Sequence, residues 1–429
     1  MTKIIFSSFI TAFLLLGCSA TDSSNTLTTP TAKEPMYVDE NTLILFALDA
    51  ENQHKYAEAV GYYDLIYKEN AQDVYADKAM DALIKGRYYN DALQRLHAKT
   101  EVGEVLSEKE QRYLVVTLLA KKEFAQAELE AKKLREFQAS EQNYILSAEV
   151  YLLQKKYVDA LSLLEEGYKI DYSERILDKM AVIIYVNMKS PYEAIGRLEA
   201  HSKNFGYSLP ITQRMAAFYA DQKDEKGLIS VYPHLYKFDP SSKNASILVQ
   251  LYWHANEIQK LKNLLEESRS NDVLLLQIYT SEKHFTKAIV VAKRLYVDTG
   301  DIEYLGQKAI LEYENAPKKK SNEIIDSLIA DLTKVVAVKE EGYFLNYLGY
   351  CLIEHDREIE IGMDYVKRAL KLEPNSAYFI DSLAWGHYKQ GNCQEAEKLM
   401  QQVVALMGSD DVEVKAHLRA IKSCKEGKK

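Results

Sequence analysis

A short phrase of apolar positions recurs along the chain from Lys55 onward: an aromatic residue, two variable residues and then an alanine. The alanine recurs about every 34 residues along the first four copies, and Ala194 continues the series. Upstream of the copies, apolar residues recur at the spacing of an amphipathic helix. The pattern predicts paired helices, with the phrase at the start of each second helix. Its copies are Tyr56–Ala59, Tyr89–Ala92, Phe124–Ala127, Tyr157–Ala160 and Phe285–Ala288.

The alanine of each phrase suits a close contact between two helices. A small residue at the start of the second helix lets it approach the first, while the aromatic residue fills the groove beside it. A hairpin of two amphipathic helices cannot bury its apolar face alone, so successive hairpins should stack around one shared core. Helix breakers are scarce, with 17 Gly and 8 Pro in 429 residues, which favours an all-α chain.

The two best copies lie near the C-terminal end and contain the runs Asn346–Tyr350 and Asp381–Trp385. They resemble the tetratricopeptide repeat family, and the resemblance extends over residues 41–425. It implies an all-α, right-handed superhelical solenoid of about eleven helix-turn-helix hairpins. A final helix, residues 412–423, is expected to cap the last hairpin. The packing face of this cap is expected to carry Val412, Ala416 and Leu418.

The repeat weakens in the middle of the chain. Gly227 and Leu261 take the alanine position there, and the spacing from Leu261 to Ala288 is shorter than the others. The run Lys318–Lys320 indicates a loop. We therefore divide the helical part into an N-terminal solenoid, residues 41–315, and a C-terminal module with its cap, residues 316–425.

The first eighteen residues predict an export signal. An apolar run from Ile4 to Leu16 follows a basic residue and is too short to span a bilayer. The run ends in Leu-Leu-Gly-Cys18, which resembles the bacterial lipobox. The resemblance implies that residues 1–17 are removed and that Cys18 carries acyl chains which anchor the mature protein. An ordinary leader cleaved at Ala20, or an uncleaved anchor, is the alternative.

Residues 18–40 are expected to form a tether, because they are rich in Ser and Thr, contain Pro30 and Pro35 and carry few apolar side chains. Position 19 is serine, whereas an aspartate there resembles the inner-membrane retention signal of enteric lipoproteins. We therefore expect a lipid anchor in the outer membrane, with the repeats on the periplasmic side. Inner-membrane and surface-exposed placements stay open.

Charge and motif content narrow the function. The formal net charge is -9 at pH 7, and an acidic surface repels the phosphates of nucleic acids. The sequence contains no Gly-rich phosphate loop, no His-Glu-x-x-His and no Gly-x-Ser-x-Gly, and its nine histidines are scattered. We therefore expect a non-enzyme without cofactor, metal, nucleic acid or small-molecule substrate, which contacts the membrane through its lipid anchor only and has proteins as partners.

The resemblance also implies a binding groove. In the family, repeat positions 2, 5, 9 and 12 face the concave side, and in the two best copies these positions are mainly aromatic. Aromatic side chains bury much area with few rotatable bonds and make good anchors for a peptide or helix. The alternative is that they pack against neighbouring hairpins. The candidate groove residues are Tyr343, Asn346, Tyr350, Tyr378, Asp381, Trp385 and Tyr388.

Three further cysteines lie near the C-terminal end, and an oxidising compartment would permit disulfides. If the last hairpin helix and the cap run antiparallel about a turn near Gly408, Cys393 and Cys424 lie almost equally far before and after this turn. Packed helix axes lie about 8 to 10 Å apart, close to the limit that a disulfide spans, so a bonded and a free pair both fit the sequence. Cys351, in a first helix, is expected to be a small buried residue.

These observations favour a scaffold or assembly factor that binds one component of an envelope machine. By family analogy the machine serves secretion, pilus biogenesis, polysaccharide export, flagellar motor structure or outer-membrane protein assembly. One alternative is a regulator or chaperone that binds a periplasmic enzyme or an unfolded client. A superhelical cell-wall lytic enzyme is the other alternative, which zymography on peptidoglycan tests.

Overall fold

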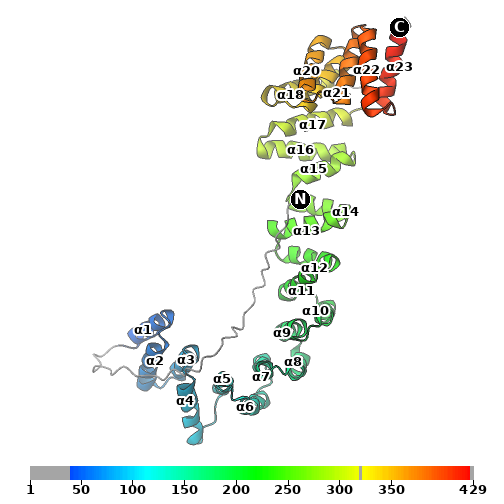
Figure 1. Cartoon of the computed structure of the whole chain (residues 1–429). Coiled ribbons are helices and arrows are strands. Elements are labelled where there is room, and N and C mark those ends of the chain that lie inside the picture. Colours follow the sequence, from blue (N-terminus) through cyan, green and yellow to red (C-terminus); the bar gives the residue numbers. More distant parts are fainter. Residues whose placement is uncertain (1–38, 318–320, 426–429) are drawn as a thin grey trace. The chain divides into compact units, whose positions relative to one another are not determined.

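The computed structural model describes residues 39–317 and 321–425. In this part of the chain the structure is helical throughout and has no β-strand (Figure 1). Its helices pair in chain order into eleven hairpins, α1/α2 to α21/α22, and α23 follows the last one. The all-α class and the tetratricopeptide-type hairpins expected from the sequence are confirmed. The expected leader, residues 1–17, the acylated Cys18 and nearly all of the tether lie outside the described residues.

The chain divides into two compact units between Asp239 and Pro240. The N-terminal unit contains the first six hairpins, and its fifth first helix ends in one turn of π-helix, η1. Its elements are α1 Glu40–Asn52, α2 Tyr56–Asn70, α3 Asp73–Lys85, α4 Tyr89–Glu101, α5 Glu108–Ala120, α6 Phe124–Phe137, α7 Glu141–Leu153, α8 Tyr157–Asp171, α9 Glu174–Val182, η1 Ile183–Asn187, α10 Pro191–Phe205, α11 Leu209–Asp221 and α12 Glu225–Phe238.

The C-terminal unit contains the other five hairpins and α23. The boundary expected between residues 315 and 316 falls inside it, at the end of α17. Ile310 of α17 and Leu328 and Leu332 of α18 lie in one hydrophobic cluster, so these two helices form an ordinary hairpin. The elements are α13 Ser242–His254, α14 Ile258–Ser268, α15 Asp272–Ser281, α16 Phe285–Thr299, α17 Ile302–Asn315, α18 Asn322–Val338, α19 Gly342–Glu354, α20 Ile359–Leu372, α21 Ala377–Lys389, α22 Cys393–Met407 and α23 Val412–Lys425.

The alanines of the repeated phrase lie in the core, where the two helices of each hairpin meet. All of them are inaccessible to solvent, and Leu261, which takes the same position in a weaker copy, is equally buried. The aromatic residues that open the phrase, such as Tyr56 and Phe124, are half-buried beside them. The sequence period is therefore the period of the core contacts. The buried alanines are Ala59, Ala92, Ala127, Ala160, Ala194 and Ala288.

Two kinds of local signal set the helix boundaries. Most first helices begin after a Ser, Asp or Asn whose side chain accepts a backbone N–H of the first turn, and Ser107 forms a full capping box with Glu110. Most second helices have no such cap and follow a turn in which one residue is left-handed, for example Lys155 with φ 62°. The side-chain N-caps of first helices are Asp39, Ser107, Ser140, Ser173, Ser208, Ser241, Asn271 and Asp301.

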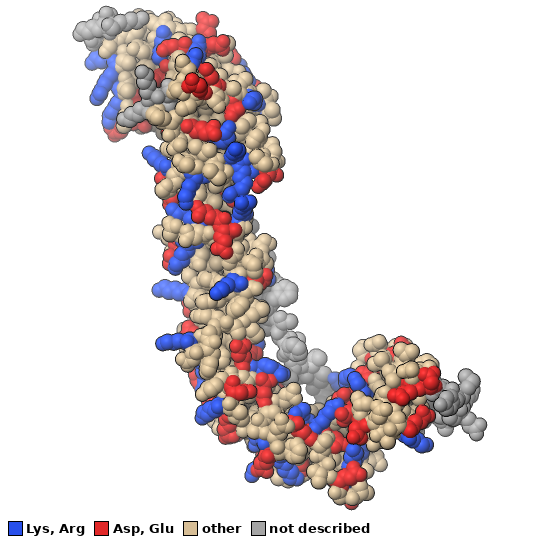
Figure 2. All heavy atoms as spheres, turned by 180° about the vertical axis from the view of Figure 1, so that it is seen from behind, with Lys and Arg blue, Asp and Glu red and all other residues tan. Residues whose placement is uncertain are grey.

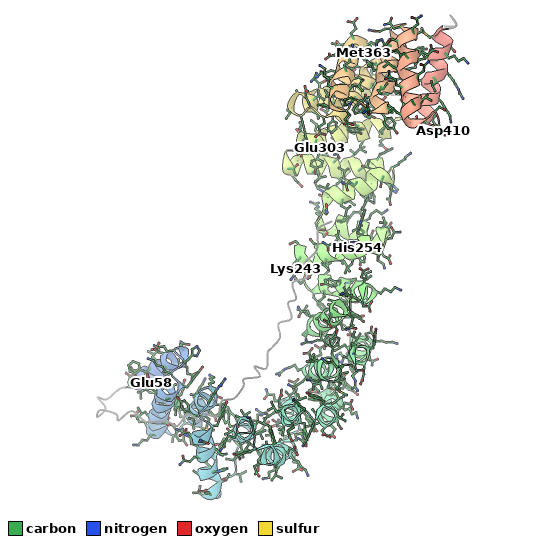
Figure 3. The ribbon with its side chains drawn as sticks, in the orientation of Figure 1. Glu58, Lys243, His254, Glu303, Met363 and Asp410 are labelled. Atoms are coloured by element: carbon green, nitrogen blue, oxygen red, sulfur yellow. A yellow bond between two sulfur atoms is a disulfide. The ribbon has the colours of Figure 1, made fainter. Side chains whose placement is uncertain are left out.

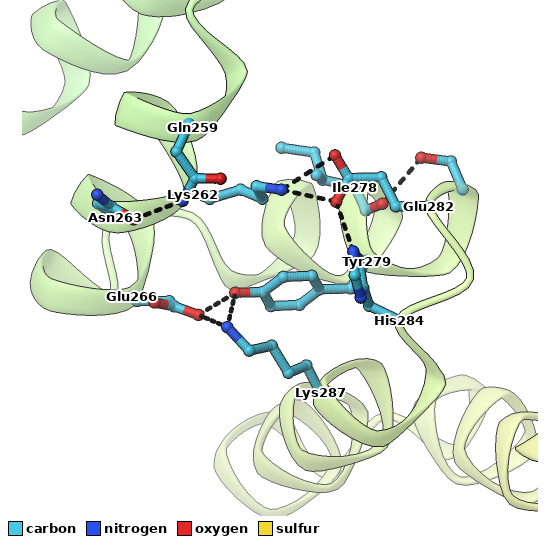
Figure 4. Close-up of polar contacts among 10 residues, drawn as sticks. Gln259, Lys262, Asn263, Glu266, Ile278, Tyr279, Glu282, His284 and Lys287 are labelled. Atoms are coloured by element: carbon cyan, nitrogen blue, oxygen red, sulfur yellow. Dashed lines mark hydrogen bonds and ion pairs between the residues drawn. The ribbon is translucent and has the colours of Figure 1, made fainter.

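Polar contacts join consecutive hairpins around the apolar core. Between α14 and the following hairpin, Lys262 Nζ donates to Glu282 at 2.7 Å, and Glu266 accepts from both Tyr279 Oη and Lys287 Nζ (Figure 4). The hydrogen bond from Tyr279 and the bond and charge of Lys287 lower the pKa of the Glu266 carboxyl below its ordinary value. Each contact is solvated and contributes little alone, but together they fix the register of one hairpin on the next.

The described surface is mixed in charge. Acidic and basic side chains are interspersed over the face drawn in Figure 2. Among the described residues, no helix is both long enough and apolar enough to cross a bilayer. The face drawn in Figure 2 therefore shows no large region of a single charge sign.

Candidate protein-binding site in the terminal module

The five helices α19–α23, here called the terminal module, approach one another closely at glycine residues. A Cβ on Gly349 of α19 would lie 2.6 Å from the carbonyl oxygen of Gly362 on α20, so only glycine permits this approach. A Cβ on Gly386 of α21 would meet Met363 at 2.6 Å. Met363 is buried among these helices (Figure 3). The module is thus a tightly packed support for side chains on its first helices.

The structure places all seven candidate residues on two first helices that pack side by side. Tyr343, Asn346 and Tyr350 lie on α19, and the others lie on α21 in the same register, one hairpin later. Tyr343 and Tyr378, at the N-terminal ends of these helices, are 52% and 63% exposed. The residues further along each helix are half-buried or buried. The face is therefore open at one end and covered at the other.

The covered end is occupied by α23. Asp381 is buried, and both of its carboxylate oxygens lie within 3.0 Å of Nδ1 of His417, which is also buried. The imidazole of His417 stacks on Trp385 with ring centroids 4.0 Å apart. Tyr350 donates its hydroxyl to Glu413. Three of the candidate residues thus bind the chain's own last helix.

Trp385 has further partners within the module. Its Nε1 donates to Glu354 at 2.6 Å, and its ring stacks on Tyr388 at 4.6 Å. Lys389 Nζ lies 5.7 Å from the centre of the same ring. Trp385 and Tyr388 are therefore held in one orientation by contacts on several sides.

The open end combines two exposed tyrosines with a polar group that lacks a partner. Oδ1 of Asn346 is shielded from solvent and has no hydrogen-bond partner among the described residues. A buried acceptor without a donor costs roughly 1–3 kcal/mol. Partial desolvation by neighbouring side chains raises the pKa of the Tyr343 hydroxyl above its ordinary value. A ligand with an apolar surface would complement the two exposed tyrosines at this end.

His417, Glu413 and Glu354 were not predicted as part of this group. The buried residues of α23 are Val414, His417 and Ile421, whereas Val412 and Ala416 are exposed, so the packing face expected for the cap was wrong except for the half-buried Leu418. Spacing of three and four residues between positions 414, 417 and 421 was the available signal. It was missed because histidine does not count as apolar, although Asp381 compensates its burial here.

A disulfide joins α22 to α23. Cys393 and Cys424, the pair considered from the sequence, are bonded, with their Cα atoms 5.9 Å apart. Cys351 is a buried free thiol, and burial raises its pKa to about 12. The bond therefore fixes the helix that covers Asp381 and Trp385.

Within residues 39–317 and 321–425, no group of three or more His, Cys, Asp or Glu side chains is arranged to hold a metal ion. The groups that remain are aromatic rings, one amide and solvated charges, which can bind a surface.

The hairpin geometry decides the type of repeat. Eleven helix pairs and a recurring turn conformation occur in the described chain together with a buried alanine about every 34 residues in its clearest copies. The described helices therefore form tetratricopeptide-like hairpins.

Comparisons with known proteins agree with this repeat type over a short stretch. No family model matches the chain. A TPR repeat-containing protein of Pseudomonas aeruginosa is 35% identical over 89 residues, which is 20% of this chain and 15% of that protein. The chain thus matches only a small part of this curated relative, and what the whole relative does is not transferred.

Two solved structures also align with most of the chain. One belongs to the Naa15/Naa10 complex bound to HypK-THB, with 17% identity, a TM-score of 0.33 and coverage of 91% of this chain and 61% of that one. The other is the APC/C hetero-tetramer Cut9-Hcn1, with 11% identity, a TM-score of 0.33 and coverage of 91% and 94%. At these TM-scores neither likeness bears on function.

Proposed function

We propose that this protein is a lipid-anchored scaffold of the outer membrane which binds one component of an envelope machine on the periplasmic side. The observation that carries protein binding is the open end of the terminal module, where Tyr343 and Tyr378 are exposed beside the unpartnered oxygen of Asn346. Exposed aromatic residues on a rigid support are typical anchors of protein interfaces. The candidate machines are those for secretion, pilus biogenesis, polysaccharide export, flagellar motors and outer-membrane protein assembly.

The anchor rests on the lipobox-like residues that end at Cys18. Several acyl chains on one cysteine would hold the protein at a membrane permanently. Growth with an alkyne-labelled fatty acid tests this: the wild-type protein should take up label and sediment with outer membranes. Cys18→Ala should lose both properties, whereas Cys351→Ala should keep the label. Label that persists in Cys18→Ala contradicts the anchor.

Site-directed photo-cross-linking in intact cells tests partner binding. Photoreactive residues replace Tyr343 and Tyr378, because Tyr350 and Trp385 are covered by α23. Lys398, exposed on α22, is the matched control. One stoichiometric envelope component captured from both tyrosines and absent from the control supports the scaffold. Many substoichiometric clients favour the chaperone, and equal capture from all three positions contradicts a binding site here.

A further inference from the structure

A row of exposed aromatic residues follows the ends of second helices in four consecutive hairpins of the N-terminal unit. Phe137, Tyr172, Phe205 and Phe238, here called the aromatic edge, end or directly follow α6, α8, α10 and α12 and recur with the repeat period of about 34 residues. They are 61%, 48%, 55% and 43% exposed. Each ring can bury about 150–250 Å², and roughly half of each side chain stays open to solvent.

Tyr172 and Phe205, the two central residues of the aromatic edge, are held in place by contacts with neighbouring rings. The rings of Tyr172 and Phe205 lie 4.8 Å apart, and Phe205 also lies 4.8 Å from the ring of His201. His201 is buried, and its Nδ1 is 2.8 Å from Oη of Tyr168, which packs edge-on against Tyr172. These rings are therefore a preorganised surface, and a partner would lose little entropy in ordering them.

Three of these second helices also carry a lysine near their C-terminal end. Lys169, Lys203 and Lys237 lie in the last turns of α8, α10 and α12, so each is separated from the next by one hairpin. All three are exposed, and none forms an ion pair with another described residue. A cation is favourable at a helix C-terminus, but that effect does not require the neighbouring aromatic residues. The lysines place positive charge at the same helix ends as the aromatic edge.

The carboxylates on this side of the unit are partly engaged. Glu174 accepts the hydroxyl of Ser208 and lies 3.7 Å from His201 Nε2. Asp171 accepts the backbone N–H of Ser173 but is exposed. Asp239 is exposed as well. A bilayer rich in anionic lipid would meet these two carboxylates alongside the lysines, whereas a protein segment can place its own charges selectively.

We propose that the aromatic edge binds a segment of a partner protein that carries both apolar side chains and carboxylates. The apolar side chains cover Tyr172 and Phe205, and the carboxylates pair with Lys169 and Lys203. Aromatic anchors with complementary charges around them are the usual composition of such interfaces. This surface is separate from the terminal module, so its test is independent of capture from Tyr343 and Tyr378.

The test begins with a photoreactive residue at Phe205 in the full-length protein in its native cells. Tyr192, exposed at the other end of the same helix α10, is the matched control. Mass spectrometry of the cross-linked product identifies the captured segment, which is then synthesised. Its Kd is measured against the purified wild-type protein and variants whose helical circular dichroism is unchanged.

We expect Phe205→Ser to weaken binding of the synthetic segment about tenfold or more, because it removes an anchor. The double variant Lys169→Gln and Lys203→Gln should also bind the segment more weakly. Its Kd should depend less on salt concentration than the Kd of the wild-type protein. Lys155→Gln combined with Lys189→Gln, at the opposite ends of the same hairpins, should leave Kd unchanged. In the cross-linking experiment, the proposal is overturned if Phe205 captures nothing or if Tyr192 captures the same product. It is also overturned if the product is a lipid adduct, a second copy of this chain or a segment without carboxylates. In the binding experiment, it is overturned if the Phe205 and lysine variants leave Kd unchanged.

Discussion

The terminal module and the aromatic edge both carry aromatic residues that recur from one hairpin to the next, but they differ in what covers these residues. In the terminal module, α23 lies where the first helix of a further hairpin would lie. Its side chains contact Tyr350, Asp381 and Trp385. Phe137 and Phe205 lie at helix ends, where stacking places no following helix over them. Burial in a repeat stack therefore depends on whether a residue faces the next hairpin, and apolar side chains at the ends of helices stay available to partners.

The largest expected effect comes from releasing α23. Replacing Cys393 and Cys424 together by serine removes a cross-link between residues 31 apart, which the loop-entropy model values at about 3 to 4 kcal/mol. The covered end of the module should then resemble the open aromatic edge. Hydrogen exchange of α23 should accelerate, and acrylamide should quench Trp385 more strongly in a Trp253→Phe background. Unchanged exchange in α23 would show that its packing alone holds it.

A smaller effect is expected when the disulfide is kept and only the buried imidazole is removed. His417→Ala deletes the ring stacked on Trp385 and leaves Asp381 buried without its partner, at a cost of about 2 to 3 kcal/mol in the free energy of unfolding. The urea midpoint followed by Trp385 fluorescence measures this. Arg419→Ala, exposed on the same helix, should change it by less than about 0.5 kcal/mol. Equal midpoints for both variants contradict a role for His417.

The smallest effect concerns the protonation of His234, which lies four residues before Phe238 of the aromatic edge. His234 stacks on Tyr207 with ring centroids 3.5 Å apart, and burial, assisted by Lys237, lowers its pKa below 6.5. The folded state therefore prefers the neutral ring. The cost of protonating His234 in the folded state lowers the free energy of unfolding in acid. The neutral ring destabilises nothing above pH 6.5, and stability is lost as the pH falls from 6.5 through the lowered pKa, because the unfolded chain takes up the proton first. An NMR titration should give a midpoint below 6.5 that rises in Tyr207→Ala; a midpoint at or above 6.5 contradicts this.

The fold was predictable because its main contacts are local in sequence. Ala59, Ala92 and Ala127 repeat with the period of the hairpins and are all buried as expected. Even Leu261, which departs from the alanine pattern, lies in the expected place. Each hairpin repeats the same contacts with its neighbours, so a period in the sequence becomes a period in space.

The candidate site was less predictable, because it depends on which neighbour covers each side chain. Family positions placed Asp381 on the face of α21, but its burial follows from His417 on another helix. Phe205 and Phe238 also repeat in the sequence, yet an apolar residue at a helix end has no periodic neighbour to indicate its exposure. Exposure results from the contacts of the folded chain, and those contacts cross hairpins.

The left-handed turns have a consequence for the length of the molecule. Lys122, Lys155 and Lys189 occupy the same turn position with φ of 61°, 62° and 57°, so the backbone leaves each turn in nearly the same direction. Excising the residues from one such position to the next joins two equivalent joints and removes one hairpin without forcing a new backbone conformation. The hairpin is therefore the unit by which the chain can become longer or shorter. Gain or loss of a whole hairpin leaves the contacts at the two ends of the chain unchanged.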